Sequence, residues 1–182
     1  MGEGSDTRDQ IMDATYRALC EHGYADLTIE RIADEFEKGK SVIYYHFDDK
    51  DDLMVSFLDH LHDRISKDLE GVDCDCQQSL DNMLEMALGL NDEETWAFRT
   101  ALFEMQSDAP YNDALATRFQ DIHDQLMDLF ADILDDLDVQ DSEQEAEMLF
   151  YTIEGIVSTR ITEGRQDDME ALKDRLVERY AR

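Results

Sequence analysis

Apolar residues recur every three or four positions along most of this chain, which is the spacing of one face of an α-helix. Near the N-terminus this pattern predicts three helices, over residues 7–22, 28–36 and 40–47. Thr28 stands where a side-chain oxygen can cap the second helix. Gly23 and Gly39 stand at the two turns, where glycine accepts a left-handed backbone.

The same periodicity predicts about six further helices. A long fourth helix follows Asp48 or Asp49, and the acidic segment 70–76 is expected to be a linker. Beyond it the predicted helices cover residues 77–90, 93–106, a long stretch that Pro110 opens, 142–163 and 167–180. The helix after Pro110 has the alternating spacing of a bundle core, at Leu115, Phe119, Ile122, Leu126, Leu129 and Ile133. We expect an all-α protein of about nine helices, with domains at residues 1–52 and 53–182.

Composition agrees with a folded helical protein. The 182 residues include one proline and eight glycines, and 42% hydrophobic residues accompany 34% charged residues. No apolar run approaches the roughly 18 residues of a membrane span. The acidic N-terminus has neither the basic nor the apolar part of a signal peptide. We therefore predict a cytoplasmic protein.

The most unusual feature of the composition is its negative charge. The chain carries 46 Asp and Glu against 16 Lys and Arg, a net charge of −30, and its 29 Asp exceed its 17 Glu. Such a composition, poor in lysine, is similar to that of proteins from salt-loving organisms. At about 1 M salt the range of charge repulsion is only about 3 Å, so repulsion among the carboxylates no longer destabilises such a fold. A protein that imitates DNA phosphate is the alternative, but the carboxylates are spread over nearly every predicted helix.

The second and third predicted helices have the pattern of a helix-turn-helix, whose second helix enters the major groove of DNA. The apolar residues of segment 39–47 lie on one side, and the residues of the other side are Lys40, Ser41, Tyr44 and His46. Lysine and tyrosine side chains are good partners for phosphate. Tyr44 and Tyr45 are alternatively half-buried core aromatics, but their basic neighbours favour contact with DNA.

This part of the chain resembles the TetR family of transcriptional regulators. The resemblance rests on the turn 23–24, the helix start 27–33, and above all the run Val-Ile-Tyr-Tyr-His-Phe at 42–47, followed by Lys50 and Leu53. Residues 96–134 are also similar, more loosely, to one type of C-terminal domain in the family. The turn departs from the family pattern at Glu37-Lys38-Gly39, which leaves open whether the recognition face is shifted.

The resemblance implies a ligand-responsive regulator, with repression as the expected action. Two heads of a homodimer would bind a palindromic operator on double-stranded DNA, and a small-molecule effector would release them. The implied DNA contacts are Lys40, Ser41, Val42 and Tyr44 in the groove, and Thr28, Tyr45, His46 and Lys50 on phosphates. Lys38 adds a further phosphate contact from the turn.

The remaining part of the chain is expected to bind the effector and the second copy. Methionine and aromatic side chains suit varied apolar ligands. The candidates are Met83, Met86, Trp96, Arg99, Phe103, Phe119, His123, Met127 and Tyr151, although each by itself is commoner as a core residue. Arg99 can pair with an anionic group. The expected dimer contacts on the last two helices are Ile153, Ile156, Val157, Leu172 and Leu176.

Two other functions stay open. An acidic helical interaction protein would keep the fold without binding DNA. A helical metal enzyme would use His60, His62 and His123, but two Glu-x-x-His helices are needed and only a weak Asp variant ends at His62. We therefore expect no enzyme, no metal and no cofactor. Cys74 and Cys76 lack a second pair of metal ligands, and their role stays open.

Overall fold

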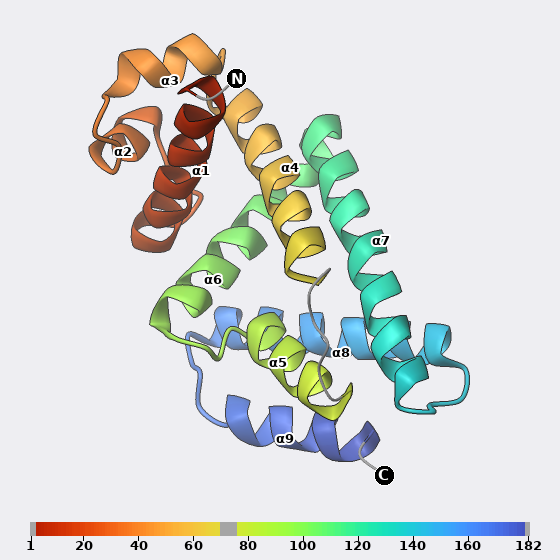
Figure 1. The fold of residues 1–182 in the computed structure, drawn as a ribbon. Coiled ribbons are helices and arrows are strands. Elements are labelled where there is room, and N and C mark those ends of the chain that lie inside the picture. The colour runs from red at the N-terminus through yellow and green to blue at the C-terminus, as the bar shows by residue number, and fades with distance from the viewer. Residues whose placement is uncertain (1–2, 70–75, 181–182) are drawn as a thin grey trace. The chain divides into compact units, whose positions relative to one another are not determined.

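The computed structural model describes residues 3–69 and 76–180, and within these ranges the chain is all-helical (Figure 1). The elements are α1 (Glu3–His22), α2 (Ile29–Asp34), α3 (Lys40–His46), α4 (Lys50–Leu69), α5 (Cys76–Leu88), α6 (Glu93–Asp108), the 3-10 turn η1 (Ala109–Tyr111), α7 (Asp113–Asp136), α8 (Ser142–Glu163) and α9 (Met169–Tyr180). These nine α-helices confirm the predicted fold class. Cys74 and most of the expected linker lie outside the described residues. None of the described helices is both long enough and apolar enough to cross a membrane.

The start of α7 differs from the prediction. Pro110 lies in η1, and the helix begins only at Asp113. Asn112 caps it, because its Oδ1 accepts hydrogen bonds from the backbone N–H groups of Ala114 at 3.1 Å and Leu115 at 3.2 Å. An asparagine at this position satisfies N–H groups that have no partner within the helix.

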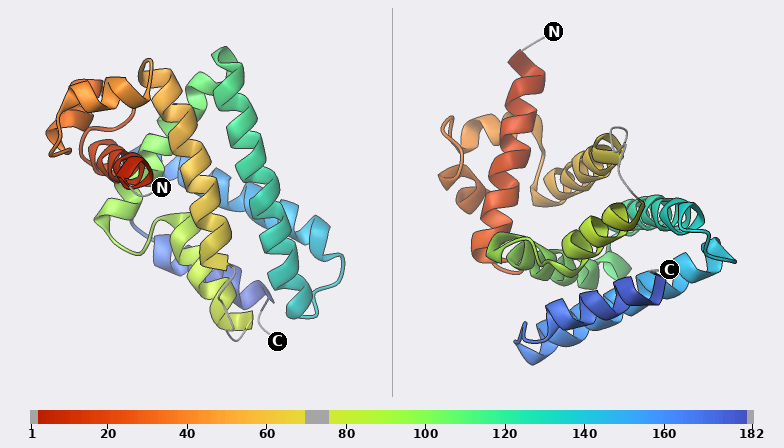
Figure 2. Two further views of the ribbon diagram at one scale, coloured as in Figure 1. Left: turned by 45° about the horizontal axis from the view of Figure 1, so that its top comes forward. Right: turned by 60° about the horizontal axis from the view of Figure 1, so that its bottom comes forward.

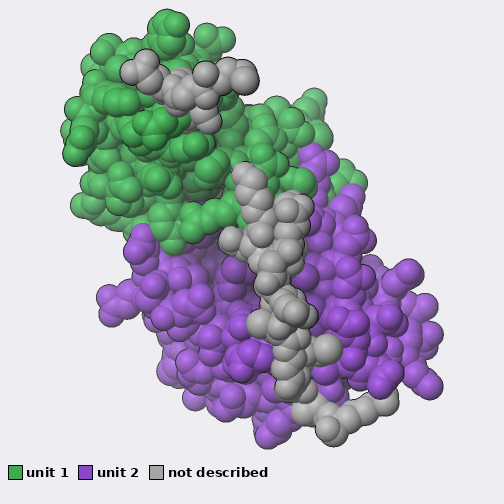
Figure 3. All heavy atoms as spheres, in the orientation of Figure 1, with its two compact units in different colours: residues 1–66, 100–120 green, residues 67–99, 121–182 purple. Residues whose placement is uncertain are grey.

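The chain forms two compact units, which are coloured separately in Figure 3. Unit 1 contains residues 1–66 and 100–120, and unit 2 contains residues 67–99 and 121–182. The helices α4, α6 and α7 therefore contribute residues to both units. The domain boundary at residue 52 stays a prediction.

Unit 1 is built on the first three helices. α1 packs against α2, and α2 packs against α3 (Figures 1 and 2). Ile11, Ile32 and Ile43 supply one fully buried side chain from each helix. The predicted cap of α2 is confirmed, because Thr28 Oγ1 accepts the backbone N–H of Arg31 at 3.2 Å. The predicted inner faces of the three helices therefore meet in one core.

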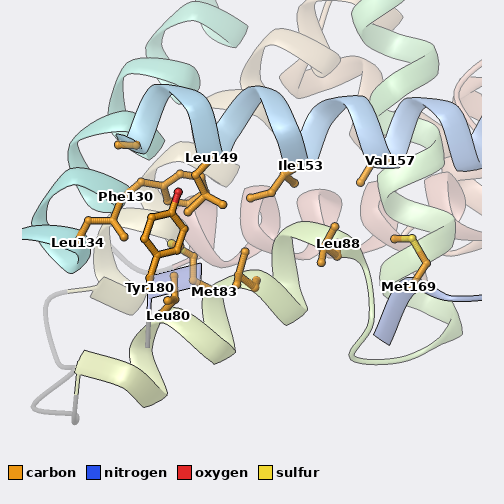
Figure 4. Close-up of a cluster of buried hydrophobic side chains, with 12 residues drawn as sticks. Leu80, Met83, Leu88, Phe130, Leu134, Leu149, Ile153, Val157, Met169 and Tyr180 are labelled. Atoms are coloured by element: carbon orange, nitrogen blue, oxygen red, sulfur yellow. The ribbon is translucent and has the colours of Figure 1, made fainter. Parts of the chain in front are cut away.

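Unit 2 has its own hydrophobic core, in which α5 packs against α8 and α9. The buried side chains point toward one another in Figure 4, and they are Leu80, Met83, Leu84, Leu88, Phe130, Leu134, Ala146, Leu149, Ile153, Val157, Met169 and Tyr180. Leu115 and Ile122 of α7 are buried as predicted. To this cluster, however, α7 contributes the buried Phe130 and Leu134, whereas the predicted core residues Leu129 and Ile133 pack half-buried against it. The apolar stripe of α7 is wide there, so spacing alone did not select the innermost positions.

One buried lysine joins α9 to α5. The side chain of Lys173 is 8% exposed, and its Nζ lies 2.9 Å from Glu85 Oε1 and 3.3 Å from Asp81 Oδ1. The hydrogen bond to Glu85 raises the pKa of Lys173, and the nearby charge of Asp81 raises it further. The ammonium group is therefore charged at neutral pH and placed between two carboxylates of α5.

Replacing Lys173 by methionine should destabilise the protein. The change keeps an extended side chain but leaves the carboxylates of Asp81 and Glu85 close together without a cation. Because these carboxylates are 33% and 39% exposed, we expect a loss of about 2 kcal/mol, less than for a fully buried pair. Denaturant unfolding in molar KCl measures this loss. Arg175→Met removes a cation from an exposed position of the same helix and should change stability by less than about 0.5 kcal/mol.

The loss should also depend on pH. Because folding raises the pKa of Lys173, its stabilising contribution is complete below the ordinary lysine pKa of about 10.4. It disappears as pH rises through the higher folded value. The stability difference between wild type and Lys173→Met should therefore be constant from about pH 7 to 10 and shrink above that range. A difference that grows at higher pH would contradict the assigned role of the ammonium group.

Candidate nucleic-acid interface

The helix-turn-helix of unit 1 consists of α2, the turn at 35–39 and α3. Gly39 ends this turn with φ of +77°, and a Cβ added to it would meet no atom within 4 Å. The left-handed backbone, rather than crowding, is therefore the reason for glycine at this position. Ile43 and Phe47 are buried on the inner side of this segment, as predicted.

The outer side of α3 presents aromatic and polar side chains. Tyr45 is 84% exposed and Tyr44 is 50% exposed. The other candidates on this helix are exposed, as for Lys40 and Ser41, or half-buried, as for Val42 and His46. The rings of Tyr45 and His46 meet edge to face, with their centroids 5.2 Å apart. Two exposed aromatic side chains together are typical of a contact surface.

Two lysines of this surface already have partners within the chain. Lys38 Nζ donates a hydrogen bond to Thr7 Oγ1 at 2.9 Å, and Lys40 Nζ donates one to Glu30 Oε1 at 3.2 Å. The backbone N–H of Glu30 and the ammonium group of Lys40 both lower the pKa of the Glu30 carboxyl. Glu30 is therefore ionised, and its pair with Lys40 joins the start of α2 to the start of α3.

Lys50 faces the turn between α1 and α2. Its half-buried ammonium group donates to the backbone oxygen of Tyr24 at 3.1 Å and lies 4.2 Å from the centroid of the Tyr24 ring. Burial lowers the pKa of Lys50, although the charges of Asp51 and Asp108 oppose this. Burial also raises the pKa of Tyr24 to about 12, helped by the same two carboxylates. A phosphate contact by Lys50 stays a prediction.

Glu104 of α6 binds the backbone N–H groups of the same turn between α1 and α2. Its Oε2 accepts hydrogen bonds from the backbone N–H groups of Tyr24 at 2.8 Å and Ala25 at 3.1 Å. A Cβ added to Gly23 would lie only 3.0 Å from this oxygen. No sequence pattern identifies Glu104, because its partner Tyr24 is 80 positions away.

Unit 2 brings together part of the predicted ligand set. Nη2 of Arg99 donates to Glu154 Oε1 at 2.7 Å, and the two side chains are 17% and 27% exposed. Nε of Arg99 is buried and has no hydrogen-bond partner among the described residues. The ring of His123 lies 4.7 Å from that of Phe150 and 6.3 Å from that of Tyr151.

The remaining ligand and dimer candidates differ in burial. In unit 2, Met83 is buried, Trp96 and Met127 are half-buried and Met86 is exposed, whereas Phe103 and Phe119 are half-buried in unit 1. Of the dimer candidates, Ile153 and Val157 are each 1% exposed within the core of unit 2, and Ile156, Leu172 and Leu176 pack half-buried against it. The first two therefore have no outer surface to offer a partner.

The histidines of the metal alternative belong to different units. His60 and His62 lie in unit 1 and His123 lies in unit 2. Across residues 3–69 and 76–180, no group of three or more His, Cys, Asp and Glu is placed to hold a metal ion. The side chain of Cys76 and all of Cys74 lie outside what the structure describes.

Two family sequence models match the chain. The model for bacterial regulatory proteins of the tetR family matches residues 11–57. A second model, described as a tetracyclin repressor-like C-terminal domain, matches residues 78–182, which is more than half of the chain.

Similar proteins with known names are regulators. Over 61 residues the chain is 38% identical to the HTH-type transcriptional regulator TtgR of Pseudomonas putida, covering 34% of this chain and 29% of that protein. Over 52 residues it is 31% identical to the HTH-type transcriptional repressor AcnR of Corynebacterium glutamicum, covering 29% and 28%. The matches thus span less than a third of the length of these curated relatives.

Solved structures extend the similarity over nearly the whole chain. A TetR transcription regulator from Haloarcula marismortui is 34% identical, covers 97% of both chains and has a TM-score of 0.81. A transcriptional regulator from Rhodococcus sp. has a TM-score of 0.78 over 96% of this chain and 94% of that one. Its identity is 18%, so this second likeness concerns the fold alone.

Proposed function

Because this chain belongs to the TetR family of bacterial regulatory proteins and is a DNA-binding transcriptional regulator, we propose that it represses transcription as a homodimer on a palindromic operator. A small-molecule effector releases it from the DNA. The observation that carries this proposal is the exposed outer side of α3, where Tyr44 and Tyr45 stand beside Lys40 and Ser41. The relatives are regulators and not enzymes, so the metal-enzyme alternative is abandoned.

α3 acts as the recognition helix in this proposal. The major groove is about 12 Å wide and admits one helix. Tyr44 and Ser41 lie on the exposed side, so their hydroxyl groups reach phosphates or base edges while the buried Ile43 holds the helix to the head. A two-fold dimer places its two recognition helices in half-sites about one helical turn or a multiple apart.

Tyr44→Ala should weaken operator binding by about tenfold, because it removes one aromatic contact and one hydrogen bond. Tyr111→Ala is the matched control, since Tyr111 is 90% exposed in η1, outside the helix-turn-helix. The control should bind within about twofold of wild type. Fluorescence anisotropy with the DNA upstream of the protein's own gene, in about 2 M KCl, measures both. Equal losses in the two variants would contradict the assignment of α3.

The same titration in different salt concentrations tests the origin of the binding energy. Residues 1–56 contain 6 Lys or Arg and 14 Asp or Glu, so the head as a whole repels phosphate. We propose that the protein works in a cytoplasm with molar salt, where this repulsion is screened. Affinity should stay flat or rise between about 0.5 and 2 M KCl, whereas a head rich in free cations would lose affinity steeply.

The dimer contact that we propose is an uncharged face of α8. Exposed residues recur on one side of this helix, at Met148, Tyr151, Thr152, Gly155, Thr159 and Thr162. They lie on the side of α8 opposite to the buried Ile153 and Val157, and none of them is charged. Two copies of a chain with net charge −30 repel each other, so an uncharged face permits close approach at least cost. The half-buried Ile156, Leu172 and Leu176 remain in the proposed contact.

Substitution of Gly155 tests this dimer, because it should stabilise the monomer and weaken the dimer. A Cβ added to Gly155 would meet no atom within 4 Å, and alanine is favoured over glycine inside a helix by about 1 kcal/mol. Gly155→Ala should therefore stabilise the monomer by about 0.5–1 kcal/mol. It should also weaken the dimer by about tenfold or more, because the added methyl group separates the two helices.

Sedimentation gives the dimer dissociation constant, and unfolding at several protein concentrations separates monomer stability from dimer stability. A variant that is more stable and at least as dimeric as wild type would exclude this face as the contact.

The effector site that we propose lies in unit 2 and is anchored on Arg99. Its buried Nε has no partner among the described residues, while its Nη2 binds Glu154. An anionic group of a ligand would accept the N–H of Nε, beside the pair of Nη2 with Glu154. Trp96, His123 and Tyr151 supply aromatic surface for an apolar part of the same ligand.

A further inference from the structure

A carboxylate lies on the surface that we propose to contact DNA. Glu30 is in the first turn of α2 and Lys40 is the first residue of α3. Their side chains are 60% and 58% exposed, and Oε1 and Nζ are 3.2 Å apart. The pair therefore stands beside the exposed Ser41 and Tyr44 of the same short helix.

DNA offers few partners to such a carboxylate. Phosphates repel it, and most polar groups of the major-groove base edges are acceptors, as the carboxylate itself is. The donors in the groove are the amino groups of cytosine, at N4, and of adenine, at N6. An ionised Glu30 at the interface therefore meets one of these amino groups or remains in water.

The neighbouring Lys40 distinguishes between the two amino groups. An ammonium group only donates, and it has three N–H bonds, of which Glu30 accepts one. Guanine presents two acceptors, O6 and N7, which are the usual partners of lysine, and cytosine presents the amino group that suits glutamate. A single G·C pair therefore supplies the preferred partner of each member of the ion pair.

We propose that Glu30 and Lys40 together read one G·C base pair in each half-site, with Glu30 accepting from cytosine N4 and Lys40 donating to guanine. This inference rests on the proposed DNA contact through α3. The lysine keeps the carboxylate locally neutral, so the pair approaches the phosphates at lower cost than an isolated glutamate would. Glu30 is thus a specificity-determining residue of an otherwise acidic head.

In-vitro selection from a randomised duplex library, with the full-length protein in molar KCl, tests this inference. Wild type should enrich a palindrome with a G·C pair at one fixed position of each half-site. Glu30→Gln should change the preferred base there from cytosine to adenine, because glutamine binds adenine N6 and N7 together. Glu30→Ala should lose about tenfold in discrimination at that position and keep only the weaker preference for guanine that Lys40 supplies.

Glu37→Gln is the matched control, because it removes the same charge from an exposed position of the turn between α2 and α3. It should enrich the wild-type palindrome. The inference is overturned if both Glu30 variants keep the wild-type base at every position, if wild type prefers adenine at the affected position, or if Glu37→Gln causes the same change. In those cases wild type still selects a palindrome and the proposed function survives. If wild type enriches no sequence, the proposed function fails and the inference fails with it.

Discussion

Repulsion among 46 acidic side chains, with 16 Lys and Arg to offset it, is the constraint on which this fold depends. The structure places cations where separate segments meet: Lys173 between α9 and α5, Arg99 between α6 and α8, and Lys50 at the turn after α1. At that same turn a carboxylate, that of Glu104, binds backbone N–H groups. Local pairing therefore orients the helices around two apolar cores, while the surface remains strongly negative.

The helices could be predicted because their signals are local. Periodic apolar residues determine which side of a helix is buried, as for Ile32 and Ile43. The cap on Thr28 needs only its own neighbours. The predicted start of α7 at Pro110 was wrong. Proline is a strong sequence signal for a helix start, but the helix begins only after Asn112, which caps it. Where the apolar face of a helix is wide, the helices packed against it determine which of its residues are fully buried. A local sequence pattern does not contain this information.

For the candidate interface, the sequence motif predicted which helix is exposed to DNA but not the contacts of its side chains. The run 42–47 identifies α3, but it does not say which acceptor Lys40 binds at the start of that helix. The pair of Lys40 with Glu30 crosses the turn between α2 and α3 over 10 positions, and the contact of Glu104 with Tyr24 spans 80 positions. Neither contact follows from a local pattern. On α8, periodicity does not separate a buried face from a dimer contact. In the structure, Gly155 and its uncharged neighbours are exposed, whereas Ile153 and Val157 are buried.

The partners of Lys38 and Lys50 have a consequence for how the regulator finds its site. Sliding along DNA depends on phosphate contacts that do not discriminate between sequences. In this head each of the two ammonium groups already donates to one acceptor of the chain, Thr7 Oγ1 or the backbone oxygen of Tyr24, and the 14 acidic side chains of residues 1–56 repel phosphate. Non-specific complexes should therefore be brief, and a specific DNA site should be reached mainly by repeated collisions from solution. The search time should then depend on the number of regulator molecules in the cell and hardly change with the length of DNA flanking the site.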